Sequence, residues 1–149
     1  MAASQVTLVE DDECILRRAP GKPSHIVMAV DLIDGTPKMQ LAALKFDDDG
    51  ISVHREKLLS DAGVEISKVA KRPGNYVFAF EIEIVRRFPG FDALHSPDED
   101  DPEIGFAHSL VQFETMSLNK KDPDIKERAN QMRAAIIASA RAVVVPTSA

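Results

Sequence analysis

The stretch Leu41-Ala-Ala-Leu-Lys-Phe-Asp-Asp-Asp-Gly-Ile-Ser-Val-His-Arg55 carries the clearest fold signal in the chain. An apolar run leads into an acidic turn that ends at Gly50, and the residues after the turn alternate between apolar and polar. Alternation with a period of two is typical of a β-strand, and a glycine in a four-residue turn can adopt positive φ. We therefore predict a hairpin that pairs residues 41–46 with residues 51–54.

The second strand of this hairpin also carries reactive side chains. Ser52 and His54 lie on one face of the predicted strand, while Ile51 and Val53 lie on the other. Residues two positions apart are separated by roughly 7 Å along a strand, and the sequence defines no third residue that would orient the histidine. An exposed sheet face is therefore the favoured interpretation, and a serine–histidine catalytic pair is the alternative.

Proline, glycine and acidic residues divide the rest of the chain into short elements. The predicted strands are 13–18, 26–33, 76–81 and 106–113, and the predicted short helices are 55–62 and 81–88. Apolar residues at every second position up to Ile84 would also suit a longer strand, and a strand that ends near Glu81 and is followed by a helix is the preferred interpretation. The C-terminal segment predicts a long helix, because Asp122 suits the N-cap, Pro123 suits the first helical position, and apolar residues then recur every three or four positions. We expect this helix to cover the core and to end before Pro146.

These elements predict an α+β fold with a mainly antiparallel, bent sheet of five or six strands. A short helix would follow the hairpin, and the long C-terminal helix would cover one face. The 149 residues are enough for a single domain. We expect a flexible arm at residues 1–12, one globular domain at residues 13–145 and a tail at residues 146–149.

The composition argues against several classes of function. The formal net charge is −6, so nonspecific binding to nucleic acid is not expected. No apolar run is long enough to span a bilayer, and the N-terminus lacks the features of a signal peptide. The single cysteine, Cys14, is interpreted as a buried inert thiol, and the chain as cytoplasmic. Four basic pairs are scattered along the chain and are interpreted as solvated: Arg17-Arg18, Lys71-Arg72, Arg86-Arg87 and Lys120-Lys121.

The common motifs for metals and cofactors are missing from the sequence. The histidines His25, His54, His95 and His108 form no closely spaced pair, and one cysteine cannot build a zinc finger. The acidic runs 47–49 and 98–101 do not have the ligand spacing of an EF-hand. No glycine-rich nucleotide loop and no serine hydrolase elbow is present. We therefore predict neither a metal nor a cofactor.

The remaining candidate functional residues are Arg17, Arg18, Ser52, His54 and His108, with Arg55 beside them. An arginine of the first pair would be suited to hold a phosphate or carboxylate, although a salt bridge is the favoured interpretation. For His108, a core or sheet-face histidine is favoured over a catalytic base.

Three segments of the chain resemble a family of small, mostly uncharacterised bacterial proteins. Residues 13–18 read Glu-Cys-Ile-Leu-Arg-Arg, residues 43–53 read Ala-Leu-Lys-Phe-Asp-Asp-Asp-Gly-Ile-Ser-Val, and Pro102 is followed by Ala-His-Ser-Leu-Val at residues 107–111. The family pattern is D-x-x-L-R-R, then F…D-G-x-S-V, then P…A-H-A-x-V, so Glu13 and Ser109 depart from it. The resemblance implies a bacterial cytosolic protein from a defence- or mobile-element-associated system. It directs attention to Arg17, Arg18, Ser52 and His108.

Two functions are compatible with these observations. The favoured one is a non-enzymatic interaction or accessory protein that binds a protein partner or a second copy of itself, because no complete catalytic constellation is present. It predicts an apolar patch or a free strand edge. The alternative is a small transferase or hydrolase acting on a nucleotide or a nucleic-acid-linked substrate, with Arg17 or Arg18 holding an anionic group. The sequence does not decide whether the protein is an enzyme.

Overall fold

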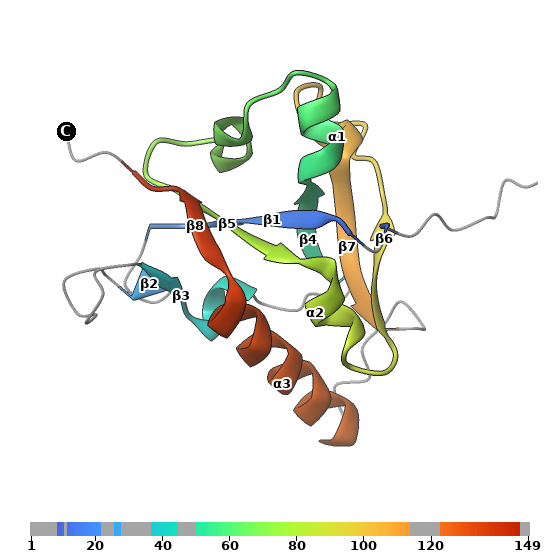
Figure 1. Cartoon of the computed structure of the whole chain (residues 1–149). Helices are drawn as coiled ribbons and strands as arrows, with labels where there is room; N and C mark the ends of the chain where they lie inside the picture. Colours follow the sequence, from blue (N-terminus) through green and yellow to red (C-terminus); the bar gives the residue numbers. More distant parts are fainter. Residues whose placement is uncertain are drawn as a thin grey trace, which may run out of the picture.

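The computed structural model describes residues 9–10, 12–21, 26–27, 37–44, 50–113 and 123–146. Six strands in this part of the chain form one antiparallel sheet in the order β6-β7-β4-β1-β5-β8 (Figure 1). The strands are β1 (Cys14–Ala19), β4 (Ile51–Arg55), β5 (Tyr76–Glu81), β6 (Phe91–His95), β7 (His108–Phe113) and β8 (Arg141–Val144). A separate small sheet pairs β2 (Ile26–Val27) with β3 (Lys38–Met39).

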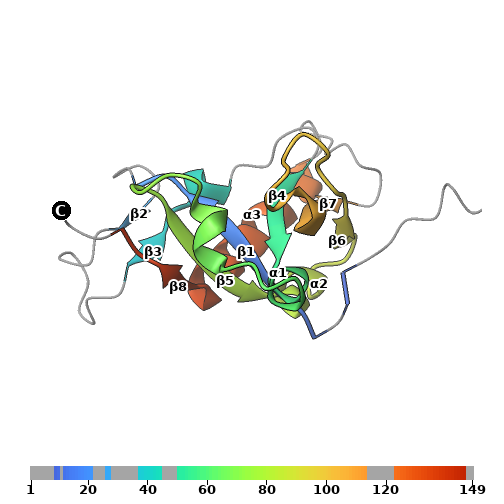
Figure 2. The ribbon, with the colours of Figure 1, turned by 90° about the horizontal axis from the view of Figure 1, so that it is seen from above.

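Helices cover both faces of the large sheet. The α-helices are α1 (Glu56–Asp61), α2 (Ile82–Arg86) and α3 (Pro123–Ser139). The 3-10 helices are η2 (Leu41–Leu44), η3 (Ile66–Ala70) and η4 (Gly105–Ala107). Figures 1 and 2 show α1 above the sheet and α3 below it.

The sheet separates two hydrophobic cores. Ile15 and Leu16 are neighbours on β1 and point to opposite faces, as expected for a strand. Ile15 packs in the larger core with Phe78 and Phe80 of β5 and with residues of α2, α3 and η2, including Met132. Leu16 packs in the smaller core with residues of α1, η3 and η4. We call these two sides of the sheet the α3 face and the α1 face.

The predicted fold class is confirmed, and so are several of its elements. The strand predicted at residues 13–18 is β1, and the predicted change from strand to helix near Glu81 is the junction of β5 and α2. The helix predicted after residue 55 is α1, and Gly63 follows it with φ of +72°. The long helix begins at Pro123 as predicted.

The predicted hairpin between residues 41–46 and 51–54 is wrong. Residues 41–44 form the 3-10 helix η2, and β4 pairs with β1 on one side and β7 on the other. Leucine and alanine favour helical backbone over strand, and the two neighbours of β4 leave no edge for another strand. Gly50 has the expected positive φ of +109°. The acidic turn at residues 45–49, Asp122 and residues 28–33 of the second predicted strand lie outside the described residues.

The C-terminal helix ends earlier than predicted. It stops at Ser139, and residues 141–144 form β8 instead, which pairs with β5. Consecutive valines disfavour the helix and suit a strand. Strand β6 was also not predicted.

The N-terminal segment is anchored where the structure describes it. Val9 is buried in the larger core, and its amide donates a hydrogen bond to the carbonyl of Ala93 at 3.0 Å. None of the helices within the described ranges has the length and apolar character that a membrane span requires.

Candidate functional site

The two predicted arginines of β1 lie on opposite faces of the sheet. Arg17 is on the α3 face, where its Nε donates to the Ala43 carbonyl at 2.9 Å and its Nη1 donates to the Ser52 carbonyl at 2.8 Å. Arg18 is on the α1 face, where its Nη1 donates to the carbonyl of Val69 at 3.3 Å. Arg17 therefore joins η2 to β4 through backbone carbonyls, while Arg18 shares a face with the other candidate residues.

The histidines of β4 and β7 are in direct contact. His54 and His108 are paired across the two strands, and their rings meet edge to face with centroids 5.4 Å apart. Burial lowers the pKa of His54 to about 4, helped by the nearby charges of His108 and Arg18. His54 is therefore neutral at pH 7, which does not suit it for binding an anion.

His108 is held in one orientation by a neighbouring loop. Its Nδ1 lies 2.7 Å from the Ser96 carbonyl. Since a carbonyl only accepts, Nδ1 carries the hydrogen and Nε2 of the neutral ring keeps a lone pair. His108 can therefore accept a proton or a hydrogen bond at Nε2.

Ser52 and His108 line one pocket on the α1 face. Its volume is about 390 Å³, and its lining residues are Gly50, Ser52, Ser96, Pro97, Asp98, His108 and Leu110. Ser52 pairs with Leu110, so it lies diagonal to His108 across the two strands. Such diagonal positions are ~7–8 Å apart, which is beyond a direct hydrogen bond for a short side chain. The pocket brings the two residues together without forming a nucleophile–base pair.

Arg55 belongs to a buried ion pair rather than to this pocket. Its Nε donates to Oε1 of Glu13 at 2.8 Å and its Nη2 donates to Oε2 at 2.5 Å. Burial acts to raise the pKa of Glu13, but the hydrogen bonds from Arg55 and from the Glu10 amide outweigh burial and lower it. The pair is structural, since both side chains are almost fully buried.

A basic cleft, which the sequence interpretation missed, lies next to these residues on the α1 face. It has a volume of about 650 Å³, and its described lining residues are Arg18, Pro20, Lys71, Arg72 and Asn75. Arg18, from one of the basic pairs, therefore meets both residues of another pair, Lys71-Arg72, that is far away in the sequence. We call this group the basic cleft.

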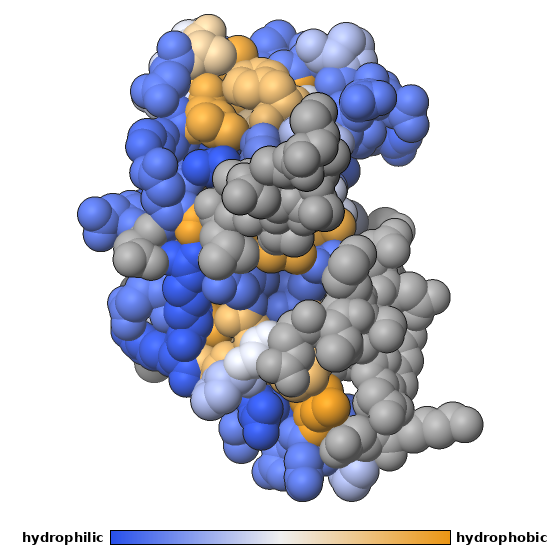
Figure 3. Space-filling view, turned by 90° about the vertical axis from the view of Figure 1, so that its right-hand side faces the viewer, coloured by the Kyte–Doolittle hydropathy of each residue, from blue (hydrophilic) through white to orange (hydrophobic). Residues whose placement is uncertain are grey.

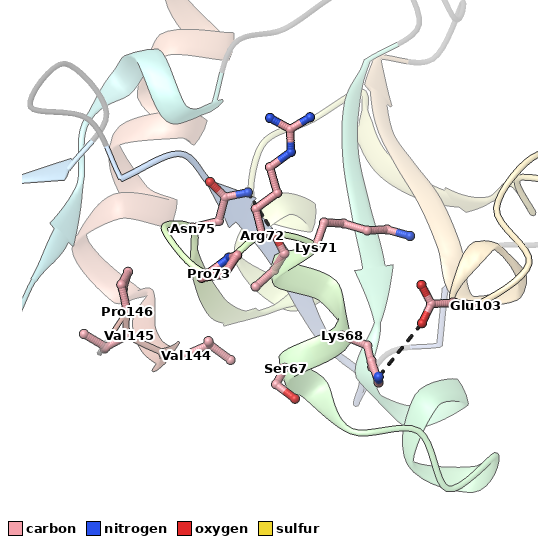
Figure 4. A pocket seen from close by; sticks show the side chains of 11 residues that line it. Ser67, Lys68, Lys71, Arg72, Pro73, Asn75, Glu103, Val144, Val145 and Pro146 are labelled. Carbon is pink, nitrogen blue, oxygen red and sulfur yellow. Dashed lines mark hydrogen bonds and ion pairs between the residues drawn. The ribbon is translucent and has the colours of Figure 1, made fainter. Parts of the chain in front are cut away.

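A second pocket adjoins the basic cleft and reaches strand β8 (Figure 4). It has a volume of about 440 Å³ and also contains Lys71, Arg72 and Asn75. One part of its wall consists of Val144, Val145 and Pro146, and Lys68 lies on the η3 side, 4.0 Å from Glu103. We call this the β8 pocket.

Lys71 lines both the basic cleft and the β8 pocket, and its backbone conformation is uncommon. Its φ is +65° and its ψ is −41°, and the Arg72 amide donates to the carbonyl of Ala70 at 2.7 Å. These values describe a γ-turn with positive φ, which is rare and strained. A residue other than glycine in such a region costs about 1–3 kcal/mol, and such residues cluster at functional sites.

Ion pairing positions the side chain of this turn. The Nζ atom of Lys71 lies 2.7 Å from Oδ2 of Asp101. Burial acts to raise the pKa of Asp101, but hydrogen bonds from Lys71 and the backbone outweigh it and lower the pKa to about 2. The side chain of Arg72 makes no hydrogen bond or ion pair with any residue in the ranges that the structure describes. Among the described residues, its guanidinium is therefore without a partner.

The described residues contain no group of three or more histidine, cysteine and acidic side chains that could hold a metal ion. His25 and the acidic run 47–49 lie outside those residues. Cys14 is half-buried, and burial together with Glu56 raises its pKa to about 12. Its thiol is therefore protonated and a poor nucleophile at pH 7.

Comparisons of the chain with protein-family models, curated proteins and solved structures found no match. The bacterial pattern described for residues 13–111 therefore stays a prediction.

Proposed function

We propose that the protein is a non-enzymatic interaction module that binds an extended, acidic segment of a partner protein along strand β8. The observation that carries this proposal is the open edge of the six-stranded sheet. On one side β8 pairs with β5, and no residue of the described chain pairs with its other side. An unpaired strand edge offers backbone donors and acceptors to an incoming strand.

The opposite edge of the sheet differs in this respect. At β6, the Val9 amide donates to the Ala93 carbonyl, and Arg86 in turn donates to the carbonyl of Val9. Where the coloured atoms of this side of the molecule are visible, hydrophilic residues surround a hydrophobic group near the upper end and smaller hydrophobic groups lower down (Figure 3). The N-terminal segment thus occupies part of the β6 edge, which favours β8 as the docking edge.

Strand β8 also exposes apolar side chains. Val143 is 38% exposed and Val145 is 50% exposed, and apart from Phe106 these are the only large hydrophobic side chains classed as exposed among the described residues. Natural edge strands are usually protected by charge or by a covering segment. Exposed valines on an open edge support a role in binding.

The charge next to β8 indicates the chemistry of the partner. The chain has a net charge of −6, yet the charged residues that line the β8 pocket are three cations, Lys68, Lys71 and Arg72, and one acid, Glu103. Arg141 adds a further cation at the start of the strand. A segment paired with β8 would place alternate side chains near these cations, so acidic side chains at every second position would be complementary.

A labelled Val-Glu-Val-Glu-Val peptide tests the proposal by fluorescence anisotropy, with Val-Lys-Val-Lys-Val as its matched control. We expect the acidic peptide to bind roughly tenfold more tightly. Val143→Glu and Lys68→Gln should each weaken this binding, and Leu94→Glu on the opposite edge should not. Equal binding of both peptides, or equal effects of Val143→Glu and Leu94→Glu, would argue against the proposal. A concentration-dependent dimer that Val143→Glu abolishes would identify a second copy as the occupant instead.

We further propose that the module acts as an accessory protein in the cytoplasm of a bacterium. A single cysteine with an inert thiol suits a reducing compartment. The resemblance to a family associated with defence or mobile elements supports the bacterial setting. Purification from the native host without any stable partner would count against this assignment.

The alternative function is a small hydrolase or transferase that acts on a nucleotide or a nucleic-acid-linked substrate. It is favoured by one observation, the shared pocket of Ser52 and His108 with an available Nε2. Arg17 would not bind the substrate there, because its guanidinium is on the other face. Release of phosphate from a panel of nucleotides would support this function only if Ser52→Ala and His108→Gln both reduce it.

A further inference from the structure

The basic cleft combines side chains that come from three separate segments. Arg18 comes from β1, Lys71 and Arg72 come from the γ-turn after η3, and Asn75 is the residue directly before β5. These side chains supply several N–H donors to one hollow of about 650 Å³. Such a volume is within the usual range of small-ligand sites.

Hydrogen bonds or an ion pair with neighbouring protein groups hold three of these four side chains in place. The Val69 carbonyl accepts from Arg18 at 3.3 Å, and the Ala70 carbonyl accepts from Nδ2 of Asn75 at 2.8 Å. Asp101 pairs with Lys71 at 2.7 Å. Because each of these contacts uses only part of the donor capacity, the cleft is organised in advance of binding.

The net charge of the cleft matches a dianion. Asp101 neutralises Lys71, and within the described part of the chain no acidic side chain forms an ion pair with Arg18 or Arg72. A phosphomonoester has a charge of about −1.5 to −2 at pH 7 and three acceptor oxygens. Guanidinium groups bind such oxygens through paired, charge-assisted hydrogen bonds.

The strained γ-turn at Lys71 determines where the Arg72 side chain lies. With φ of +65° at Lys71, the chain reverses so that Lys71 and Arg72 leave the turn in different directions (Figure 4). The turn places Arg72 beside Asn75, although Arg72 has no partner within the described part of the chain. Strain that presents an unpaired cation to a cleft is typical of a binding site.

We propose that the basic cleft binds the phosphoryl group of a phosphomonoester, with Arg18 and Arg72 as the principal ligands and Asn75 as a neutral donor. This site does not depend on strand pairing at β8. Arg18 lines the basic cleft but not the β8 pocket, whereas Lys68 lines the β8 pocket but not the basic cleft. The two proposals can therefore fail separately.

Titration with inorganic phosphate, followed by amide chemical shifts, tests the site. We expect saturable shifts at residues 70–75. Arg18→Gln and Arg72→Gln should each weaken phosphate binding roughly tenfold, since each removes one charge-assisted contact. Arg87→Gln is the matched control, because it removes the same charge from the exposed residue that follows α2 and pairs with Glu83. Arg72→Gln should fold normally, as its side chain has no described partner.

Two ligands distinguish the source of the phosphoryl group. A nucleoside monophosphate represents a free small molecule, and a phosphoserine in the Val-Glu-Val-Glu-Val peptide represents a modified partner. Tighter binding of the phosphopeptide than of the plain peptide, lost in Arg18→Gln, would assign the site to a phosphorylated partner. Tighter binding of the nucleotide than of phosphate would assign it to a small molecule. Absence of saturable phosphate shifts, or equal affinities in Arg18→Gln, Arg72→Gln and Arg87→Gln, would overturn the inference even if the acidic peptide binds at β8.

Discussion

His54 packs edge to face against His108 at the centre of the α1 face, with ring centroids 5.4 Å apart and an interplanar angle of 77°. Only 7% of His54 is exposed. Burial is the largest cause of its lowered pKa, and His108, Arg18 and Lys71 act in the same direction while Asp101 opposes them. The folded protein therefore resists protonation of a ring that the unfolded chain protonates readily.

This difference predicts a loss of stability in mild acid. The pKa of His54 is about 4 in the folded state against 6.5 for the free side chain. Between these values the unfolded state binds the proton and the folded state does not, so stability falls as the pH falls. We expect about 2 kcal/mol less stability at pH 5 than at pH 7.5 from this residue. Urea unfolding at both pH values measures the change.

His54→Phe is the control for this prediction, because it keeps an aromatic ring against His108 and cannot be protonated. The carboxylates of Glu13 and Asp101 also have lowered pKa values. Their contribution to the stability of the fold is lost only below the ordinary pKa of a carboxylate, which lies outside the range from pH 5 to pH 7.5. An identical pH dependence in His54→Phe and the unaltered protein would show that His54 is not responsible.

The buried pair of Arg55 and Glu13 predicts a large effect from a single substitution. Arg55→Met leaves the Glu13 carboxylate buried without its main partner, which typically costs about 3–5 kcal/mol. Lys57→Met is the matched control, since Lys57 and Glu10 form an exposed pair at 2.8 Å. Exposed pairs of this kind contribute little to stability, because water screens their charges. Chemical denaturation of both variants checks the contrast, and equal losses would contradict the structural role of Arg55.

The elements that the sequence predicted correctly have strong local patterns. In β4, apolar and polar residues alternate, and the change of period after Phe80 marks the junction of β5 and α2. The prediction for residues 41–44 was wrong because a short apolar run has no periodicity that distinguishes a strand from a helix. Strand β8 was not predicted because its pairing with β5 joins segments more than 60 positions apart, and a local sequence pattern does not show such a pairing.

The candidate site was predictable only in part for the same reason. Ser52 and His54 share a face by simple alternation, and that part of the prediction is confirmed by their register with Leu110 and His108. The meeting of Arg18 with Lys71 and Arg72 depends on how β1 pairs with β5 and on the γ-turn before β5. The Lys71-Arg72 pair followed by Pro73-Gly74 signals a turn, but not which strand it faces.

The γ-turn at Lys71 predicts that a glycine there stabilises the fold. Lys71→Gly relieves a φ of +65°, and this gain should exceed the loss of a partly exposed ion pair with Asp101. We expect a gain of about 0.5–1 kcal/mol in the free energy of unfolding. Lys68→Gly, one turn earlier in η3, should instead cost about 1 kcal/mol, because glycine disfavours a helical position. Thermal unfolding of the two variants gives the sign, and a loss of stability in Lys71→Gly would show that the turn is not strained.

Two glycines, Gly105 in the loop that holds Asp101 and Gly74 before β5, should differ strongly in their tolerance of alanine. A Cβ atom at Gly105 would lie 1.9 Å from the carbonyl oxygen of Asp98, whereas one at Gly74 would meet nothing within 4 Å. The Gly105 carbonyl also accepts from the Asp98 amide at 2.9 Å, so the backbone on both sides of the clash is tied together. We expect Gly105→Ala to cost about 2–3 kcal/mol and Gly74→Ala to cost less than about 0.5 kcal/mol.

The loop also links this prediction to the basic cleft. Oδ1 of Asp101 accepts from the amides of Glu103 and Ile104, so displacement of the loop by Gly105→Ala would move the carboxylate away from Lys71. The amide shifts of Lys71 and Arg72 should therefore change in Gly105→Ala and stay as they are in a Leu94→Ala variant on β6. If Gly105→Ala destabilises the protein while those shifts do not move, the loop supports the fold but does not position the γ-turn.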